Sequence, residues 1–284
     1  RGLAPTPYAN KFSNRLTVTA GEPAGAVILL SKRKALWLCC CICGVLLAVG
    51  ADRSPTRRLL ILHTNHIHDH VRAGENGIGG LAFIAGAVRQ IRQERGGVLV
   101  LDAGDATEKG DLVAARTDGM ITFEAMRFVG YDGITLGNHD LVGNPRELLA
   151  KYESALGQRF LCANLLGSDG LAVFESSRLI EVNGIRVGVV GLTLAAREGG
   201  KQLGVLDLKR SGAELRRQAL LLREKGADLV VALCHEGSRD CAELAAAAPE
   251  VAVFVSGHTH EVLQAPIIVP ATGALIAPIE LATG

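Results

Sequence analysis

Residues 57–70 read RRLLILHTNHIHDH, an apolar run followed closely by four histidines. The stretch Leu59–His63 is typical of a strand buried on both faces, because every residue before His63 is apolar. Five later runs share this short, largely apolar and β-rich character. They are Val98–Asp102, Gly133–Leu136, Arg186–Gly191, Leu229–Leu233 and Val251–Val255.

Longer amphipathic segments separate these runs and predict helices. The predicted helices are Gly80–Gln93, Gly119–Val129, Pro145–Ala155 and Gly212–Lys225, with a surface helix at Ala242–Ala248. Alternating strands and helices indicate an α/β fold whose sheet is covered by other layers. Neither a Gly/Ser linker nor an internal repeat interrupts residues 57–284, so we expect one domain there. Its last twenty residues are expected to add one or two strands.

The first fifty residues have a different character. Residues 1–34 show no regular period and are interpreted as a leader without an assigned fold. Lys32, Arg33 and Lys34 precede the uncharged apolar run 35–51, which predicts a secretory signal peptide. An uncleaved signal anchor is the main alternative, and a buried helix is a weaker one. We therefore expect an exported protein, periplasmic or extracellular, that contacts a membrane only through residues 35–51.

Composition limits the partners of the chain. Hydrophobic residues make up 48% of the 284 residues, which excludes an intrinsically disordered chain. Lys and Arg number 30 against 29 Asp and Glu, and aromatic residues are 4%, so bulk nucleic acid is not an expected partner. Four of the seven cysteines lie in the run 35–51. The other three, Cys162, Cys234 and Cys241, are interpreted as small buried residues.

All eight histidines lie at or just after the carboxyl end of a predicted strand. They occupy the segments His63–His70, Gly137–Asp140, Cys234–Gly237 and Ser256–His260, and a fifth strand end contributes Asp102–Asp105. Loops at the carboxyl ends of strands in α/β sheets converge on one crevice. A lone histidine is usually a surface residue, but this set predicts a metal site with nitrogen and oxygen donors.

Two features favour a site for two ions. In an extended segment, His66 and His68 would point the same way, as would His258 and His260, so both members of each pair would reach one ion. A shared carboxylate such as Asp105 would lie between two ions about 3.5–4 Å apart, as in two-metal phosphoester sites. We therefore expect two divalent ions, with Mn, Zn, Fe or Co as the candidates.

Five segments, in this order along the chain, resemble the calcineurin-like metallophosphoesterases, specifically the catalytic domain of the bacterial 5′-nucleotidase and UDP-sugar hydrolase group. They are Leu62–His68, Gly104-Asp105, Gly137-Asn-His-Asp140, His235-Glu-Gly237 and Gly257-His-Thr-His260. The resemblance covers most of residues 57–261. It implies a layered αββα sandwich with the metal site at the carboxyl ends of the strands. It also implies hydrolysis of nucleotide 5′-monophosphates or related small phosphoesters.

The resemblance further implies a role for each matched residue. His68 and His260 would bind one ion, Asp105 would bridge both ions, and the second ion would take Asn138, His235 and His258. A hydroxide formed from water that the two ions make acidic would attack phosphorus in line. His139 would stay off the ions and would either protonate the leaving oxygen or stabilise charge on the phosphoryl group; proton transfer suits an imidazole.

Three departures from the family pattern stand out. His66 occupies the position of a family aspartate, which leaves the ion pair more positive. Val142 replaces an aspartate that often orients the catalytic histidine, so Asp140 is a candidate for that orienting role. The chain ends at Gly284, so we expect it to lack the separate nucleotide-binding domain of this group.

Other functions also fit the pattern. A cyclic-nucleotide phosphodiesterase or a thiosulfohydrolase of the same fold is the alternative within the enzyme class. Because of His66 and Val142, a catalytically impaired binding module is the alternative from another class.

Overall fold

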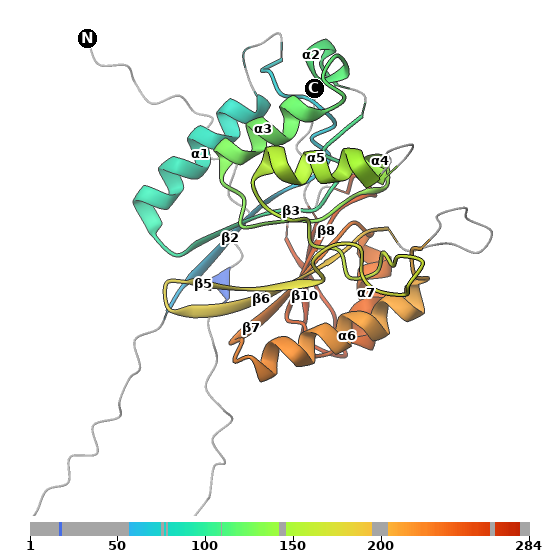
Figure 1. The fold of residues 1–284 in the computed structure, drawn as a ribbon. Coiled ribbons are helices and arrows are strands. Elements are labelled where there is room, and N and C mark those ends of the chain that lie inside the picture. Colours follow the sequence, from blue (N-terminus) through green and yellow to red (C-terminus); the bar gives the residue numbers. More distant parts are fainter. Residues whose placement is uncertain are drawn as a thin grey trace, which may run out of the picture.

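A computed structural model describes residues 17–18, 57–74, 77, 79–108, 110–141, 146–194, 204–261 and 265–278. Two β-sheets stack face to face in this part of the chain (Figure 1). The first sheet has the strand order β1-β2-β3-β4. Its strands are β1 (Thr17–Val18), β2 (Leu59–Thr64), β3 (Val98–Asp102) and β4 (Gly133–Ile134).

The second sheet has the order β5-β6-β7-β8-β10-β9. Strands β6, β7, β8 and β10 run parallel to one another, whereas β5 and β9 are antiparallel edge strands. Their bounds are β5 Ser177–Val182, β6 Ile185–Leu192, β7 Leu229–Cys234, β8 Val253–Ser256, β9 Ile267–Ile268 and β10 Leu275–Pro278.

Helices cover the outer face of each sheet, which produces the four-layer αββα sandwich that the sequence predicts (Figure 1). On the first sheet lie α1 (Gly80–Arg95), α3 (Met120–Val129) and α5 (Arg146–Leu156), with the short helices α2 (Leu112–Ala115) and α4 (Asn138–Leu141) nearby. On the second sheet lie α6 (Leu208–Glu224) and α7 (Ser238–Ala247).

The centre of the molecule is a largely apolar layer between the two sheets. Alternate residues of β2 and β3, such as Ile61 and Leu99, face Val189 and Val231 of the second sheet. The other face of β3 packs under the helices, so all five of its residues are buried. Burial on both faces is the reason that the strand lacks a polar alternation.

Strand register aligns the carboxyl ends of neighbouring strands. In the first sheet Thr64 pairs with Asp102, and Asp102 pairs with Ile134. In the second sheet Cys234 pairs with both Leu192 and Ser256. The loops that follow β2, β3, β4, β7 and β8 therefore begin at one edge of the sandwich.

The six predicted strands and five predicted helices all occur, with shifted ends. Helix α6 begins at Leu208 rather than Gly212, because Asp207 caps it by accepting a hydrogen bond from Arg210 N. Helix α7 begins at Ser238 and is only partly a surface helix, since Cys241 and Leu244 are buried. Strands β9 and β10 are the late strands that the sequence predicts. Strand β5 was missed, because its half-exposed residues lack an apolar run.

Among the described residues, no helix combines the length and apolar character needed to span a bilayer. The predicted signal segment 35–51 and the residue Val142 lie outside the described residues.

Candidate metal centre

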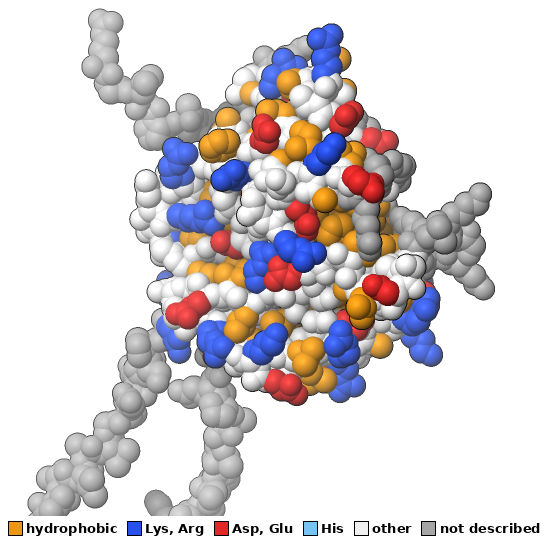
Figure 2. All heavy atoms as spheres, in the orientation of Figure 1, with side chains coloured by type: hydrophobic (Ala, Val, Ile, Leu, Met, Phe, Trp, Pro, Cys, Tyr) orange, Lys and Arg blue, Asp and Glu red, His pale blue; other side chains and the backbone are white. Residues whose placement is uncertain are grey.

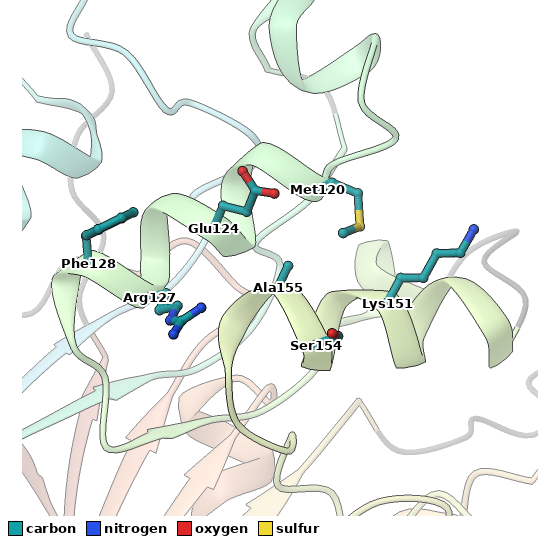
Figure 3. Close-up of a pocket in the computed structure, with 7 residues that line it drawn as sticks. All are labelled: Met120, Glu124, Arg127, Phe128, Lys151, Ser154 and Ala155. Atoms are coloured by element: carbon teal, nitrogen blue, oxygen red, sulfur yellow. The ribbon is translucent and has the colours of Figure 1, made fainter.

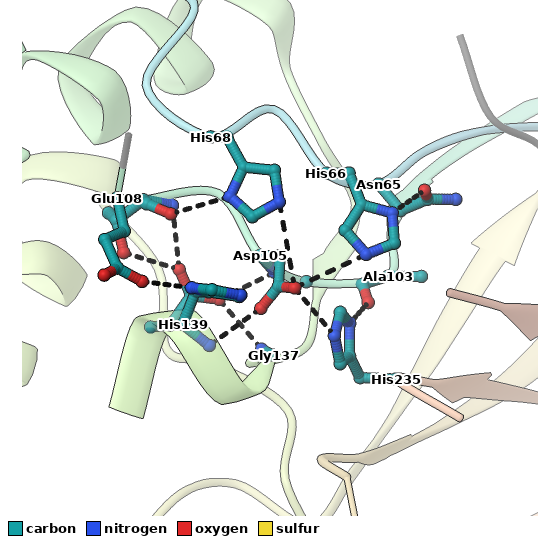
Figure 4. Close-up of polar contacts among 12 residues, drawn as sticks. Asn65, His66, His68, Ala103, Asp105, Glu108, Gly137, His139 and His235 are labelled. Atoms are coloured by element: carbon teal, nitrogen blue, oxygen red, sulfur yellow. Dashed lines mark hydrogen bonds and ion pairs between the residues drawn. The ribbon is translucent and has the colours of Figure 1, made fainter. Parts of the chain in front are cut away.

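Asp105 lies at the centre of a cluster of imidazoles from both sheets (Figure 4). Its Oδ2 atom is 3.0 Å from Nε2 of His235, 3.4 Å from Nε2 of His66 and 3.9 Å from Nε2 of His68. Asp105 follows β3, His66 and His68 follow β2, and His235 follows β7. The aligned strand ends therefore bring side chains that are up to 169 positions apart in the sequence to one carboxylate.

Three of these imidazoles use Nδ1 for a hydrogen bond inside the protein, and each acceptor is an oxygen atom that cannot donate. Nδ1 must therefore carry the proton, which leaves the lone pair on Nε2. In metal sites, this outer hydrogen bond fixes the ring orientation and the tautomer of the ligand. The acceptors are Asn65 Oδ1 for His66 at 2.8 Å, Thr107 O for His68 at 3.1 Å and Ala103 O for His235 at 2.7 Å.

Several donor atoms at the cluster are buried without a hydrogen-bond partner. They are Nε2 of His66, Nε2 of His235 and Oδ1 of Asn138. An unpaired buried polar atom costs about 1–3 kcal/mol, so such atoms are rare unless a ligand completes them. Two nitrogen lone pairs and an amide oxygen around a carboxylate form a donor set that suits Zn, Mn or Fe.

His258 and His260 complete the group that the sequence predicts. The ring of His260 stacks on that of His66 with centroids 4.0 Å apart, and the ring of His258 lies 5.3 Å from that of His235. Ligand atoms of His66, His68 and His260 lie within 4.8 Å of one another, and so do those of His66, Asp105 and His235. All seven predicted metal ligands thus lie at the same edge of the sandwich.

Electrostatics favour the protonation states that a metal requires at His66, His68 and Asp105, but not at His235. Burial lowers the pKa of His66 and of His68, which favours neutral imidazoles. Burial alone would raise the pKa of Asp105, but its contacts with His235 and His66 hold that pKa well below its usual range. The same carboxylate outweighs burial at His235 and raises the pKa of that imidazole.

Two glycines allow the loops to approach this closely. A Cβ atom on Gly137 would lie 2.0 Å from Asp105 Oδ1, and one on Gly104 would lie 2.5 Å from Gly137 N. Gly104 also has φ of +91°, which favours glycine. The Gly-Asp and Gly-Asn-His-Asp segments therefore begin with glycine because any side chain at these two positions would clash with the neighbouring loop.

The backbone at the histidine pairs differs from the expected extended form. Strand β2 ends at Thr64, and His66 and His68 have φ of 51° and 44°. His258 and His260 likewise have φ of 69° and 54°. The alternation argument was therefore wrong in its geometry, because both pairs lie in left-handed turns. Residues in this sparsely populated region cluster at functional sites.

His139 and Asp140 lie beside the cluster on helix α4, but they face different groups. His139 N donates to Asp105 Oδ1 at 2.9 Å, and Nδ1 of its ring contacts Oε2 of Glu108. The Asp140 carboxylate accepts from Gly137 N and Asp105 N at 2.8 and 2.9 Å, and from both the N–H and the hydroxyl of Thr107. Asp140 thus holds the loop that presents Asp105.

Sequence reasoning missed Glu108, and only a weak signal pointed to it. It is a carboxylate three residues after the predicted ligand Asp105, on the same loop. The Asp69 carboxylate supports this loop, because it accepts hydrogen bonds from Glu108 N at 2.7 Å and from Thr122 Oγ1.

Away from this site, the surface has a hollow between α3 and α5 (Figure 3). Met120, Glu124 and Phe128 of α3 line it opposite Lys151 and Ala155 of α5, and none of these residues belongs to the metal cluster. Over the face drawn in Figure 2, basic and acidic side chains are interspersed, in keeping with the net charge of +1.

Comparison with known proteins identifies the family. Residues 59–262 match the family model described as calcineurin-like phosphoesterase, which is well over half of the chain. The chain belongs to this family. The match includes strands of both sheets and every histidine of the cluster.

Several curated relatives that match this chain are named as 5′-nucleotidases. A 5′-nucleotidase of Vibrio cholerae is 30% identical over 234 residues, which cover 74% of this chain and 41% of the relative. A probable 5′-nucleotidase of Treponema pallidum is 29% identical over 248 residues, covering 78% and 40%. The chain therefore spans about two fifths of the length of these relatives.

Solved structures confirm the fold. A 5′-nucleotidase precursor from Thermus thermophilus has 25% identity and a TM-score of 0.64, and the match covers 78% of this chain and 48% of that one. The NAD nucleotidase of Haemophilus influenzae, at 23% identity, has a TM-score of 0.66 over 78% and 44% of the two chains. The layered metallophosphoesterase sandwich predicted from sequence is confirmed.

Proposed function

We propose that this chain hydrolyses nucleotide 5′-monophosphates or related small phosphoesters with the help of two divalent ions. The observation that carries this proposal is the set of imidazoles around Asp105 whose Nδ1 atoms are engaged and whose Nε2 atoms face the carboxylate. The names of the relatives supply the substrate class.

The donor atoms divide into two groups around the shared carboxylate. His68 and His260, with His66 beside them, would hold one ion. Asn138, His235 and His258 would hold the other, and Asp105 would be common to both. When bound, the ions supply positive charge that stabilises phosphoryl oxygens and acidifies water. The unpaired buried atoms Asn138 Oδ1 and His235 Nε2 support this division.

The protein's own groups would complete the reaction. His139 lies beside the cluster, with its ring centroid 4.9 Å from that of His68, and its backbone is fixed on Asp105. With Nδ1 engaged by Glu108, Nε2 is the ring nitrogen that would deliver a proton to the leaving oxygen. Asp140 would act by fixing the loop of Asp105 rather than by touching substrate.

The test is phosphate release from 5′-AMP and 4-nitrophenyl phosphate, with Mn²⁺, Zn²⁺ or Co²⁺ titrated into metal-free protein. We expect turnover that requires metal and falls at least 10²-fold for 5′-AMP in His139→Ala. His70→Ala is the control histidine, because His70 is exposed on the loop that also carries His66 and His68. Metal binding without turnover of 5′-AMP, cyclic nucleotides or thiosulfate esters would instead support a binding module.

We also propose that residues 35–51 direct export of the chain or anchor it to a membrane. The basic cluster Lys32–Lys34 before an uncharged apolar run supports this. N-terminal sequencing and fractionation of the expressed protein distinguish cleavage, anchoring and cytosolic retention.

A further inference from the structure

We propose that Glu108 is the positioning residue for His139, a role that rests on the proposed hydrolase function. The contact between Oε2 of Glu108 and Nδ1 of His139 joins the loop after β3 to helix α4 (Figure 4). The Glu108 side chain is 48% exposed and that of His139 is 23% exposed, so the pair lies at the open rim of the cluster.

The backbone that carries Glu108 is fixed from two sides. Its own N–H donates to Oδ2 of buried Asp69 at 2.7 Å. The preceding residue, Thr107, donates to Asp140 from its N–H at 2.9 Å and from its hydroxyl at 2.8 Å. Glu108 itself has φ of 73°, a conformation that persists only where surrounding contacts determine it. The loop therefore holds this carboxylate in a set direction although its side chain is half-exposed.

His139 is also held by two contacts, and the one with Glu108 fixes the orientation of its imidazole ring. The backbone N–H of His139 donates to Asp105 Oδ1 at 2.9 Å, which fixes the residue but not the rotation of its imidazole. A carboxylate on Nδ1 keeps the proton on that nitrogen and directs Nε2 the opposite way. The Asp140 carboxylate already accepts four hydrogen bonds, one each from the N–H groups of Gly137, Asp105 and Thr107 and one from the Thr107 hydroxyl.

The chemical consequence concerns the leaving group. As the bond from phosphorus to the leaving oxygen breaks, its electron pair stays on that oxygen, which takes the proton from Nε2 of the His139 imidazolium. Water supplies the hydroxyl that joins phosphorus, and its second proton restores the imidazolium. Glu108 would hold Nε2 toward the leaving oxygen without touching the substrate.

Leaving groups of different basicity test this role. An alkoxide such as that of 5′-AMP needs the proton, whereas 4-nitrophenolate leaves with little help. We expect Glu108→Ala to lower kcat for 5′-AMP about 10²-fold, with KM changed less than threefold, and to lower kcat for 4-nitrophenyl phosphate much less. Glu108→Gln, which keeps an acceptor oxygen, should recover part of the loss. Adding Glu108→Ala to His139→Ala should cost nothing more, because both remove one function.

The control is Glu124→Gln, since Glu124 is an exposed carboxylate on α3 away from the cluster. Metal content and thermal unfolding of each variant report whether the site and the fold survive. Equal losses on both substrates, or additive losses in the double variant, would overturn the proposal. If the wild-type protein turns over neither substrate, the hydrolase proposal fails by itself. Long-range ¹H–¹⁵N NMR correlations of His139 then test the inference by showing which ring nitrogen carries the proton. The inference is refuted if Nδ1 carries no proton in the wild-type protein. It is also refuted if the His139 tautomer is the same in Glu108→Ala.

Discussion

Replacing Gly137 with alanine tests whether the close approach of two loops creates the metal site. The added Cβ atom would lie 2.0 Å from Asp105 Oδ1 and 2.5 Å from Asp105 N. Ordinary van der Waals contact begins near 3.4 Å, so the two loops must separate by about 1.4 Å. That shift also breaks or lengthens the hydrogen bond from His139 N to Asp105 Oδ1.

A movement of this size would carry the Asp105 carboxylate away from the imidazoles that surround it. Misplacement of a reacting group by about 1 Å costs on the order of 10²-fold in rate, and loss of ligand geometry weakens metal binding by a similar factor. We therefore expect Gly137→Ala to bind Mn²⁺ or Zn²⁺ at least 10²-fold more weakly than wild-type protein. Calorimetric titration of metal-free protein measures the affinity, and elemental analysis measures the stoichiometry.

A matched glycine separates this local effect from a general cost of glycine replacement. Gly86 lies on the exposed side of α1, and a Cβ atom there would meet nothing within 4 Å. Gly86→Ala should bind metal normally and stabilise the helix by about 0.5–1 kcal/mol. If a folded Gly137→Ala protein binds metal as tightly as Gly86→Ala, the steric argument for the site is refuted.

Three further predictions concern the charges at the site. His66→Asp should lower the ratio of the Mn²⁺ dissociation constant to the Zn²⁺ dissociation constant at least tenfold, because a carboxylate oxygen favours the harder ion. Competition titrations measure this ratio, and an unchanged ratio would contradict the prediction. Burial raises the pKa of Asp102 from 3.8 to about 7, so the folded protein retains that proton and ionisation opposes folding as pH rises. In metal-free protein, Asp102→Asn should therefore gain about 3 kcal/mol relative to wild type between pH 4.5 and 7.5 in urea unfolding, and a pH-independent difference would count against it. Metal at about a hundredfold its dissociation constant should add about 2.7 kcal/mol to the free energy of unfolding, reversibly with a chelator; an unchanged Tm would mean that the cluster binds no ion.

Much of the fold follows from local patterns in the chain. The buried strands β3 and β7 are continuous apolar runs, and such runs identify strands because both faces are covered. Strand β5 was not predicted in this way, because it is an edge strand whose residues are mostly half-exposed and form no continuous apolar run. The start of α6 depended on a single capping contact at Asp207 that periodicity does not register.

The composition of the candidate site also follows from the order of residues along the chain. His235 and Asp105 each follow a predicted strand, and parallel register brings the ends of such strands to one edge. What the sequence did not indicate was the local backbone. His66 and His68 converge through left-handed turns, which require hydrogen bonds from their N–H groups to the Asp105 loop.

The sequence by itself indicated the order of most strands and helices along the chain and the candidate metal ligands, because these depend on apolar periodicity and on placement at strand ends, while the family resemblance implied the four layers. Only the tertiary structure decided which group each polar side chain serves. Asp140 turns to the Asp105 loop, while Glu108 reaches His139 across 31 positions of sequence. Such pairings arise where separate loops meet, and their geometry depends on packing between sheets rather than on any local pattern.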